Sequence, residues 1–307
     1  MALAAVEDWE IHQVDVETAF LNAVLEEDLY MEAPIGFGFP PGSVFKLYKS
    51  LYGLKQAPRV WNKALNDWLL SLSFIQNVID TSVYSGGTGS SPTYLAVYVD
   101  DILIFGHDIN YISEFKRALH SKFAIKDLGE VKHILGMLVT RDRVKRTISL
   151  SQSTYLTRLI KKFGLNPDTS FSAKPIPISK AVVKTVVDTS NGLGSGAPIE
   201  QHIPFRSLLG GILYANTCSR PDISFAVSSL ASHCVDPRKM HWYALLDLLR
   251  YISDTRDVAP TYGGTPIPGS KVNQVQLFAD ADFSRNPDTK KSRSGFVIFL
   301  NGVAIAF

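Results

Sequence analysis

Two adjacent aspartates, Asp100 and Asp101, interrupt the most apolar segment of the sequence. The flanking residues 94–99 and 102–106 are mostly β-branched or aromatic, which predicts two strands with the aspartates at the tip of a hairpin. Neighbouring carboxylates at an apolar edge repel each other and resist desolvation, and a bound divalent cation would offset that cost. Because Asp is also a common turn residue, an acidic turn without chemistry is the alternative.

A third carboxylate, Asp15, lies at the far end of an earlier segment with strand character, residues 10–16. If the fold brings Asp15 beside the hairpin tip, the three acids could together hold two Mg²⁺ ions, with Mn²⁺ as an alternative. Mg²⁺ binds oxygen ligands from a few carboxylates and from substrate phosphates. Two such ions can activate a hydroxyl and stabilise a departing pyrophosphate, so the acids predict phosphoryl transfer.

The segments around these acids alternate between strand and helix patterns, which predicts an α+β fold. Trp61, Leu65 and Leu69 recur at helical spacing in a segment that begins near Pro58. Further helices are expected at 109–122, 153–163 and within 205–256, and strands at 274–280 and 295–300. Residues 166–204 have no periodicity and several Pro, Ser and Gly, so they predict a linker or long loop.

The composition is that of a globular protein and excludes a disordered chain, with 46% hydrophobic and 20% charged residues in 307. No apolar run approaches the roughly 20 residues that span a bilayer, and the N-terminus lacks a signal-peptide pattern. We therefore expect no membrane partner. Cys218 and Cys234 suggest a zinc site only if joined by His233 and His241, whose spacings fit no common pattern; ordinary thiols are the preferred interpretation.

Charge is distributed unevenly although the net charge is only +2. Residues 1–110 contain five basic and fourteen acidic residues, whereas residues 115–164, from Lys116 to Lys162, contain twelve basic and three acidic residues. An acidic part followed by a basic part suits a metal site beside a phosphate-binding surface. Solvated helix faces are the equally simple alternative.

Three long motifs contain the candidate acids, in the order 15–22 (DVETAFLN), 49–62 (KSLYGLKQAPRVWN) and 98–101 (YVDD). Together they resemble successive motifs of the reverse transcriptases of copia-type LTR retrotransposons (Pseudoviridae). Residues 126–130 with 135–137 resemble the motif that leads to the primer-contacting hairpin in that family. Segments 205–214, 220–227 and 241–242 resemble the helical region that follows, so the resemblance covers essentially the whole chain.

The resemblance implies a role for individual residues. Asp15 and Asp100 would hold the metal ions, with the Val16 carbonyl as a further ligand and Asp101 alongside. Phe20 would stack under the sugar and exclude a 2′-hydroxyl, and Lys126 would donate a proton to the leaving pyrophosphate. The remaining residues, expected to line the nucleotide and template side, are Tyr52, Gly53, Lys55 and Gln56.

The resemblance also implies a division of the chain into a reverse-transcriptase palm of antiparallel sheet and helices (1–150), a basic thumb-like helix (151–165), the linker (166–204), a helical connection (205–262) and the start of an RNase H-like domain (263–307). Asp280 would be the first metal ligand of that last domain, whose other ligands lie further on in the family. We expect two strands and no nuclease activity there. The basic fingers segment of the family precedes the Asp15 strand and is not included here.

The expected function is that of an RNA-directed DNA polymerase with an RNA template, a DNA primer and dNTPs as partners. Because the fingers position the triphosphate in this family, we expect weak or no activity from this chain alone. The alternative is a catalytically inactive retrotransposon remnant that at most binds nucleic acid. The resemblance implies a cytoplasmic location in a virus-like particle, with the nucleus as the alternative, and gives no oligomeric state.

Overall fold

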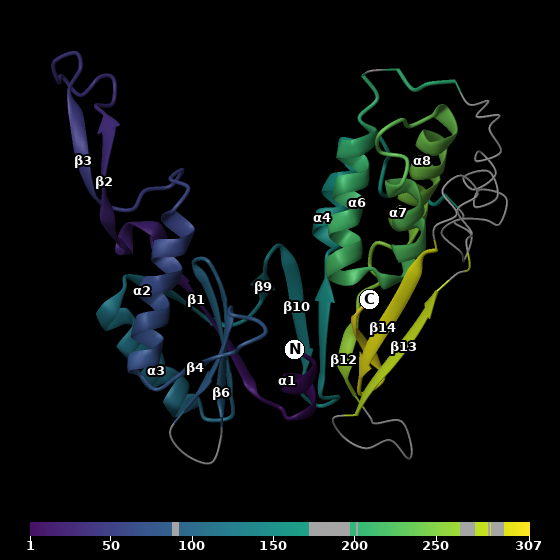
Figure 1. The fold of residues 1–307 in the computed structure, drawn as a ribbon. Helices are drawn as coiled ribbons and strands as arrows, with labels where there is room; N and C mark the ends of the chain where they lie inside the picture. The colour runs from purple at the N-terminus through teal and green to yellow at the C-terminus, as the bar shows by residue number, and fades with distance from the viewer. Residues whose placement is uncertain (88–91, 172–196, 201, 265–273, 282, 284–291) are drawn as a thin grey trace. The chain divides into compact units, whose positions relative to one another are not determined.

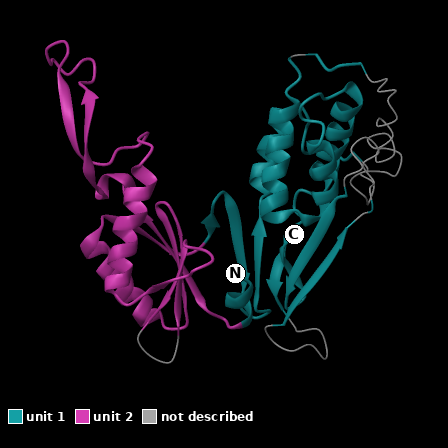
Figure 2. Cartoon of the chain, viewed as in Figure 1, with its two compact units in different colours: residues 1–6, 132–307 teal, residues 7–131 magenta. Residues whose placement is uncertain are grey.

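Helices alternate with antiparallel strands along the chain, which confirms the expected α+β class (Figure 1). The computed structural model describes residues 1–87, 92–171, 197–200, 202–264, 274–281, 283 and 292–307. Most of the expected linker, 172–196, lies outside these residues. The chain divides into unit 1, residues 1–6 and 132–307, and unit 2, residues 7–131 (Figure 2).

Unit 2 is built on a six-stranded sheet with the order β4-β5-β6-β7-β1-β8. Its strands are β1 (Glu10–Val16), β4 (Ile75–Gln76), β5 (Val83–Gly86), β6 (Thr93–Tyr98), β7 (Asp101–Gly106) and β8 (Ile125–Glu130). The expected strand at 10–16 and the expected hairpin are both confirmed. β1 comes early in the chain but lies between β7 and β8, so it is a central strand.

Two helices of unit 2, α2 (Ala57–Ser71) and α3 (Ile109–Lys122), cover one face of this sheet. Val14 and Val16 of β1 share one buried core with Trp61 of α2 and Phe115 of α3. The α3 helix begins at Asp108, whose carboxylate accepts hydrogen bonds from two backbone N–H groups of the first turn. Because strand side chains alternate, the odd-numbered residues of β1 point to the opposite face of the sheet.

A two-stranded ribbon of β2 (Val24–Glu32) and β3 (Val44–Lys49) extends from unit 2. It encloses the Pro- and Gly-rich segment 34–42. A short 3₁₀ helix, η1 (Ala19–Asn22), connects β1 to the ribbon. Thr18 precedes η1 with a positive φ of 50°, so the chain turns sharply directly after the Asp15 strand.

Unit 1 contains a second sheet with the order β12-β11-β10-β9. Its strands are β9 (His133–Ile134), β10 (Met137–Asp142), β11 (Thr147–Ser151) and β12 (Thr261–Gly263), and α1 (Ala2–Val6) packs beside it. Residues 132–150 were expected to belong to the palm, and within them β11 pairs with β12 from far along the sequence. The two compact units meet at residue 131, whereas the family resemblance implied a division at 150.

The described helices of unit 1 other than α1 form one apolar core. They are α4 (Ser153–Lys162), α6 (Phe205–Ser219), α7 (Ser224–Ala231) and α8 (Lys239–Asp254), with a 3₁₀ turn η2 (Pro221–Ile223) before α7. The expected helices are confirmed, and Gly164 has the positive φ of 80° that a helix C-terminal glycine supplies. None of the described helices combines the length and the apolar character that crossing a bilayer requires.

A third sheet, also in unit 1, comprises β13 (Val275–Ala281), β14 (Ser294–Leu300) and β15 (Val303–Ala306). The expectation of only two strands here was wrong. β15 has four residues joined to β14 by Asn301-Gly302, both with positive φ. A strand this short gives little periodicity, and its turn residues were not recognised as a hairpin signal.

Candidate active site

Backbone pairing places Asp15 directly opposite Asp101, because β1 and β7 run antiparallel in that register. Residues opposite each other on adjacent strands point to the same face of a sheet. For Asp15 and Asp101 this face is opposite to the one covered by α2 and α3. The sequence motifs 15–22 and 98–101, about 85 residues apart, therefore meet in one place.

The third acid, Asp100, lies in the two-residue turn between Tyr98 and Asp101, which are themselves paired. Val99, the other turn residue, has a φ of 57°, a conformation that costs a β-branched residue about 1–3 kcal/mol. Two contacts stabilise the turn. The Trp61 indole N–H donates to the Val99 carbonyl at 2.7 Å, and the Val16 N–H donates to the Asp100 carbonyl at 2.8 Å.

Trp61 was expected only as part of a helix face and a family motif. Its role at the turn was missed, although a buried indole N–H needs an acceptor and so gave a signal. The strain at Val99, held from two sides, fixes where the Asp100 backbone lies. The Val16 contact also joins the end of β1 to this turn, so both candidate metal ligands depend on the same hydrogen bonds.

The charges of the three acids act on one another. Burial raises the pKa of Asp15, and the charges of Asp100 and Asp101 raise it further. The Asp101 carboxylate accepts a hydrogen bond of 2.7 Å from the Gln13 amide, which is buried two residues before Asp15 on the same face of β1. Sequence analysis did not single out Gln13. It orients one of the acids, and no local pattern distinguishes it from other strand glutamines.

Lys126 is the register partner of Asp15 on its other side, in β8. Its charge lowers the pKa of Asp15, opposing the two aspartates. The candidate general acid therefore lies on the same sheet face as the candidate metal ligands. Among the residues proposed from the resemblance, Asp15, Asp100, Asp101 and Lys126 are brought together.

The donor types fit Mg²⁺, since carboxylate and carbonyl oxygens are its preferred ligands and the mutual repulsion at Asp15 favours a cation. Within the part of the chain that the structure describes, no three His, Cys, Asp or Glu side chains gather closely enough to hold a metal ion. Mg²⁺ is usually bound by one or two carboxylates with waters and substrate phosphates, so an incomplete protein cage does not conflict with it. That Asp15, Asp100 and Asp101 bind metal stays a prediction.

Four of the five other candidate nucleotide-site residues lie in one stretch between β3 and α2. Phe20 of η1 packs against Tyr52 with ring centroids 4.7 Å apart, so these two predicted residues do meet. Gly53 has a φ of 98°, which only glycine adopts freely. Lys55 is exposed, and the Gln56 amide donates to Glu27 of the ribbon at 3.2 Å. Their contact with a nucleotide stays a prediction.

The basic segment needs one correction. Lys116 was counted with the residues that could follow a nucleic-acid backbone, but it is only 8% exposed and its ammonium contacts Asp127 and His12, both at 2.7 Å. Periodicity alone cannot separate a buried lysine from an exposed one. Arg158, Lys161 and Lys162 of α4 are exposed, as expected.

Two further candidates lie in unit 1. Asp280 is exposed on β13, where its carboxylate accepts a hydrogen bond from the Ala281 N–H at 2.8 Å. Its metal-binding role stays a prediction. Cys218 and Cys234 are free thiols. Among the described residues, neither belongs to a group of three side chains that could hold a metal ion.

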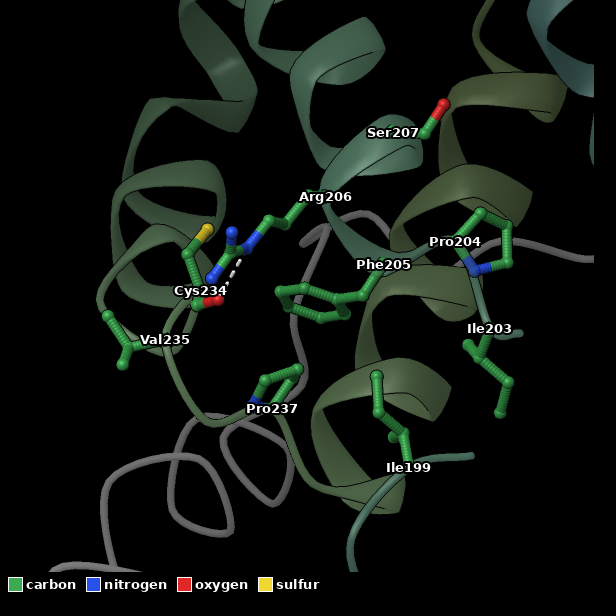
Figure 3. Close-up of a pocket in the computed structure, with 9 residues that line it drawn as sticks. All are labelled: Ile199, Ile203, Pro204, Phe205, Arg206, Ser207, Cys234, Val235 and Pro237. Carbon is green, nitrogen blue, oxygen red and sulfur yellow. Dashed lines mark hydrogen bonds between the residues drawn. The ribbon is translucent and has the colours of Figure 1, made fainter. Parts of the chain in front are cut away.

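A shallow pocket of about 230 Å³ also lies in unit 1 (Figure 3). Apolar side chains such as Ile199, Phe205 and Val235 line it, and the Arg206 guanidinium beside it donates to the Cys234 carbonyl at 2.8 Å. Among the described residues that line it there is no carboxylate. The candidate acids lie in unit 2, so this pocket is not the candidate site.

The chain is similar to a known protein family and to several known proteins. Residues 1–180 match the family model described as reverse transcriptase (RNA-dependent DNA polymerase). The chain is 35% identical over its whole length to the retrovirus-related Pol polyprotein from transposon TNT 1-94 of Nicotiana tabacum. It is 34% identical over 98% of its length to the corresponding polyprotein from transposon RE1 of Arabidopsis thaliana.

A shorter relative is the putative transposon Ty5-1 protein of Saccharomyces cerevisiae, 30% identical over 96% of this chain and 91% of the yeast protein. By contrast, the chain spans only 23% and 19% of the tobacco and Arabidopsis polyproteins. The similarity therefore covers nearly all of this chain but a small part of those relatives.

Proposed function

The chain belongs to the reverse transcriptase (RNA-dependent DNA polymerase) family and is similar to copia-type Pol polyproteins, and from this premise we propose that it provides the polymerase core of such a polyprotein. The reaction would add deoxynucleotides to a DNA primer on an RNA template. The observation that carries this proposal is the register of Asp15 opposite Asp101, beside the turn that holds Asp100.

Asp15, Asp100 and the Val16 carbonyl would hold two Mg²⁺ ions, with Asp101 alongside. When bound, the ions supply the positive charge that makes the primer 3′-hydroxyl a nucleophile and stabilises the departing pyrophosphate. Phe20, supported by Tyr52, would lie under the sugar and select against a 2′-hydroxyl. Lys126 would donate a proton to the pyrophosphate oxygen, a contribution that is typically 10²–10⁴-fold for general acids.

For unit 1, the family resemblance supports a thumb and connection role for α4 to α8 and an RNase H-like identity for β13 to β15. The exposed basic residues of α4 suit contact with the phosphates of a template–primer duplex. Asp280 would be a metal ligand of that RNase H-like region.

Primer extension on poly(rA) tests the polymerase proposal. We expect the chain alone to extend a primer barely or not at all, because misplacement of the triphosphate can cost a hundredfold or more. Joined to an upstream fingers segment from a relative, it should extend the primer, and Asp100→Asn should abolish that activity. Asp67→Asn, an exposed acid on α2 in the same unit, is the matched control and should leave activity unchanged.

Inactivity of the joined protein, with both units shown to be folded, would refute the proposal. It would favour the alternative of a remnant that binds nucleic acid without catalysis. Vigorous extension by the chain alone would show that the fingers matter less than the family resemblance implies.

A further inference from the structure

β8 contains one extra residue relative to its partner strand, and this bulge decides which side chain faces Asp15. His12 pairs with Glu130 and Gln13 with Gly129, but Val14 pairs with Asp127 and Asp15 with Lys126, so Leu128 has no partner. If the pairing at His12 continued without the bulge, Asp15 would face Asp127. Lys126 would then pair with Val16 and point to the other face, because a one-residue shift reverses every side chain.

The bulge therefore determines whether a cation or a fourth carboxylate lies beside the candidate metal ligands. Facing Asp127 instead of Lys126 would add negative charge to a position where two acids already raise the pKa of Asp15. Bulges re-aim side chains and are frequent next to active sites. The contacts that stabilise this bulge therefore also determine the arrangement of the candidate site.

A cluster of three side chains adjoins the bulge: the buried Lys116 of α3, the half-buried His12 of β1 and Asp127 of β8, whose side chain is 53% exposed. The Lys116 ammonium is 2.7 Å from Asp127 Oδ1 and 2.7 Å from His12 Nδ1. Lysine is almost never buried without a partner, and the other buried residues of α3 outside this cluster are apolar. A leucine or methionine would serve packing equally well, which indicates that the charge has a separate role.

Asp127 also shapes the bulge directly. Its Oδ1 accepts a hydrogen bond of 2.9 Å from the Gly129 N–H, across the unpaired Leu128, and Gly129 has a φ of 72°. One carboxylate thus joins the two sides of the bulge to each other and, through Lys116, to α3 and β1. In the shifted register, Asp127 would leave Lys116 and point to the opposite face.

We propose that Lys116, His12 and Asp127 are positioning residues that hold the β8 bulge and so keep Lys126, and not Asp127, opposite Asp15. The importance of Lys126 for catalysis rests on the proposed function, but the register does not. The cluster touches no reacting atom and acts only through the strand it fixes.

Cross-strand NMR contacts in the chain as it stands test the proposal without any activity. The unaltered chain should show contacts of Asp15 with Lys126. In Lys116→Met and in Asp127→Asn, these contacts should weaken severalfold, with new contacts between Asp15 and residue 127. Asp142→Asn is the matched control, since Asp142 likewise accepts from a backbone N–H, that of Lys145, at 2.9 Å and pairs with the lysine ammonium, but on the surface.

A lower melting temperature with the Asp15–Lys126 contacts intact in both variants would show a merely stabilising cluster and overturn the proposal. A kinetic arm uses the protein joined to its fingers segment. There Asp127→Asn should lower kcat with little change in KM, and adding Lys126→Ala should lower it no further; additive losses would contradict the proposed coupling. If Lys126→Ala has no effect while the register shifts in the variants, the proton-donor role fails and the positioning role stands.

Discussion

Removal of the Asp222 carboxylate should destabilise unit 1 far more than removal of a surface acid, because it leaves the Arg220 guanidinium buried without a counter-charge. Arg220 has no exposed surface, and it forms two hydrogen bonds with Asp222, at 2.9 and 2.7 Å. It also donates to the Thr255 carbonyl and hydroxyl, at 3.1 and 2.7 Å. Burial alone would raise the pKa of Asp222, but the Arg220 and Tyr251 contacts lower it below its usual range.

The expected loss of unfolding free energy depends on how far the side chains of Arg220 and Asp222 are exposed. Asp222→Ala strands a fully buried cation and should cost about 3–5 kcal/mol. Arg220→Met should cost less, because the Asp222 side chain is 32% exposed and can rehydrate. For the same reason the double variant Arg220→Met/Asp222→Ala should be more stable than Asp222→Ala alone. Asp247→Ala breaks an exposed ion pair with Arg250 on α8 and should cost about 0–1 kcal/mol.

Urea unfolding of 5-fluorotryptophan-labelled protein measures these differences unit by unit. Of the four tryptophans, Trp242 alone belongs to unit 1, so its ¹⁹F signal reports that unit separately. Equal losses for Asp222→Ala and Asp247→Ala would refute the reasoning, as would a double variant less stable than Asp222→Ala.

Three further predictions concern pH, nucleotide choice and salt. Burial, with His233 and Arg238, lowers the pKa of His241 from 6.5 to about 4, so its contribution is fully present above pH 6.5 and lost as pH falls through 4. The free energy of unfolding, read at Trp242, should be lower at pH 4.5 than at pH 7, with His241 contributing at most about 3 kcal/mol of the difference. That contribution should be missing in His241→Gln, and an equal difference in that variant would contradict the assignment. In the protein joined to its fingers segment, Phe20→Ala should reduce discrimination against ribonucleotides about tenfold or more, measured by single-nucleotide insertion, and unchanged discrimination would leave Phe20 a packing residue. Binding of an RNA–DNA hybrid should weaken steeply with salt. Lys161→Ala should reduce the slope of log affinity against log salt concentration by about one, whereas substitution of the buried lysine, Lys116→Met, should not. An affinity that does not depend on salt would show that the basic segment is an ordinary solvated surface.

Local patterns predicted the elements that carry the site. The alternating and apolar segments at 10–16 and 94–106 form β1, β6 and β7, and the helical spacing from Trp61 onward forms α2. The meeting of Asp15 with the hairpin tip was predicted from chemical need and family resemblance. The register that places Asp15 opposite Asp101 is a property of the paired strands and cannot be predicted from either segment alone.

What sequence reasoning missed depends on contacts between distant segments. The Leu128 bulge is defined only by comparing β8 with β1, and the burial of Lys116 only by the presence of His12 and Asp127. The pairing of β11 with β12 joins residues more than a hundred positions apart, and neither segment's own pattern indicates it. None of these features has a helical or strand period that a window of sequence could reveal.

Metal binding by the chain itself shows whether Asp15 and Asp100 hold divalent cations. Mn²⁺ titration followed by electron paramagnetic resonance, with Mg²⁺ as competitor, measures it in the chain itself. The account predicts a Mn²⁺ site that Asp15→Asn and Asp100→Asn each weaken about tenfold or more, while Asp67→Asn leaves it unchanged. Equal Mn²⁺ affinity in all four proteins would contradict it.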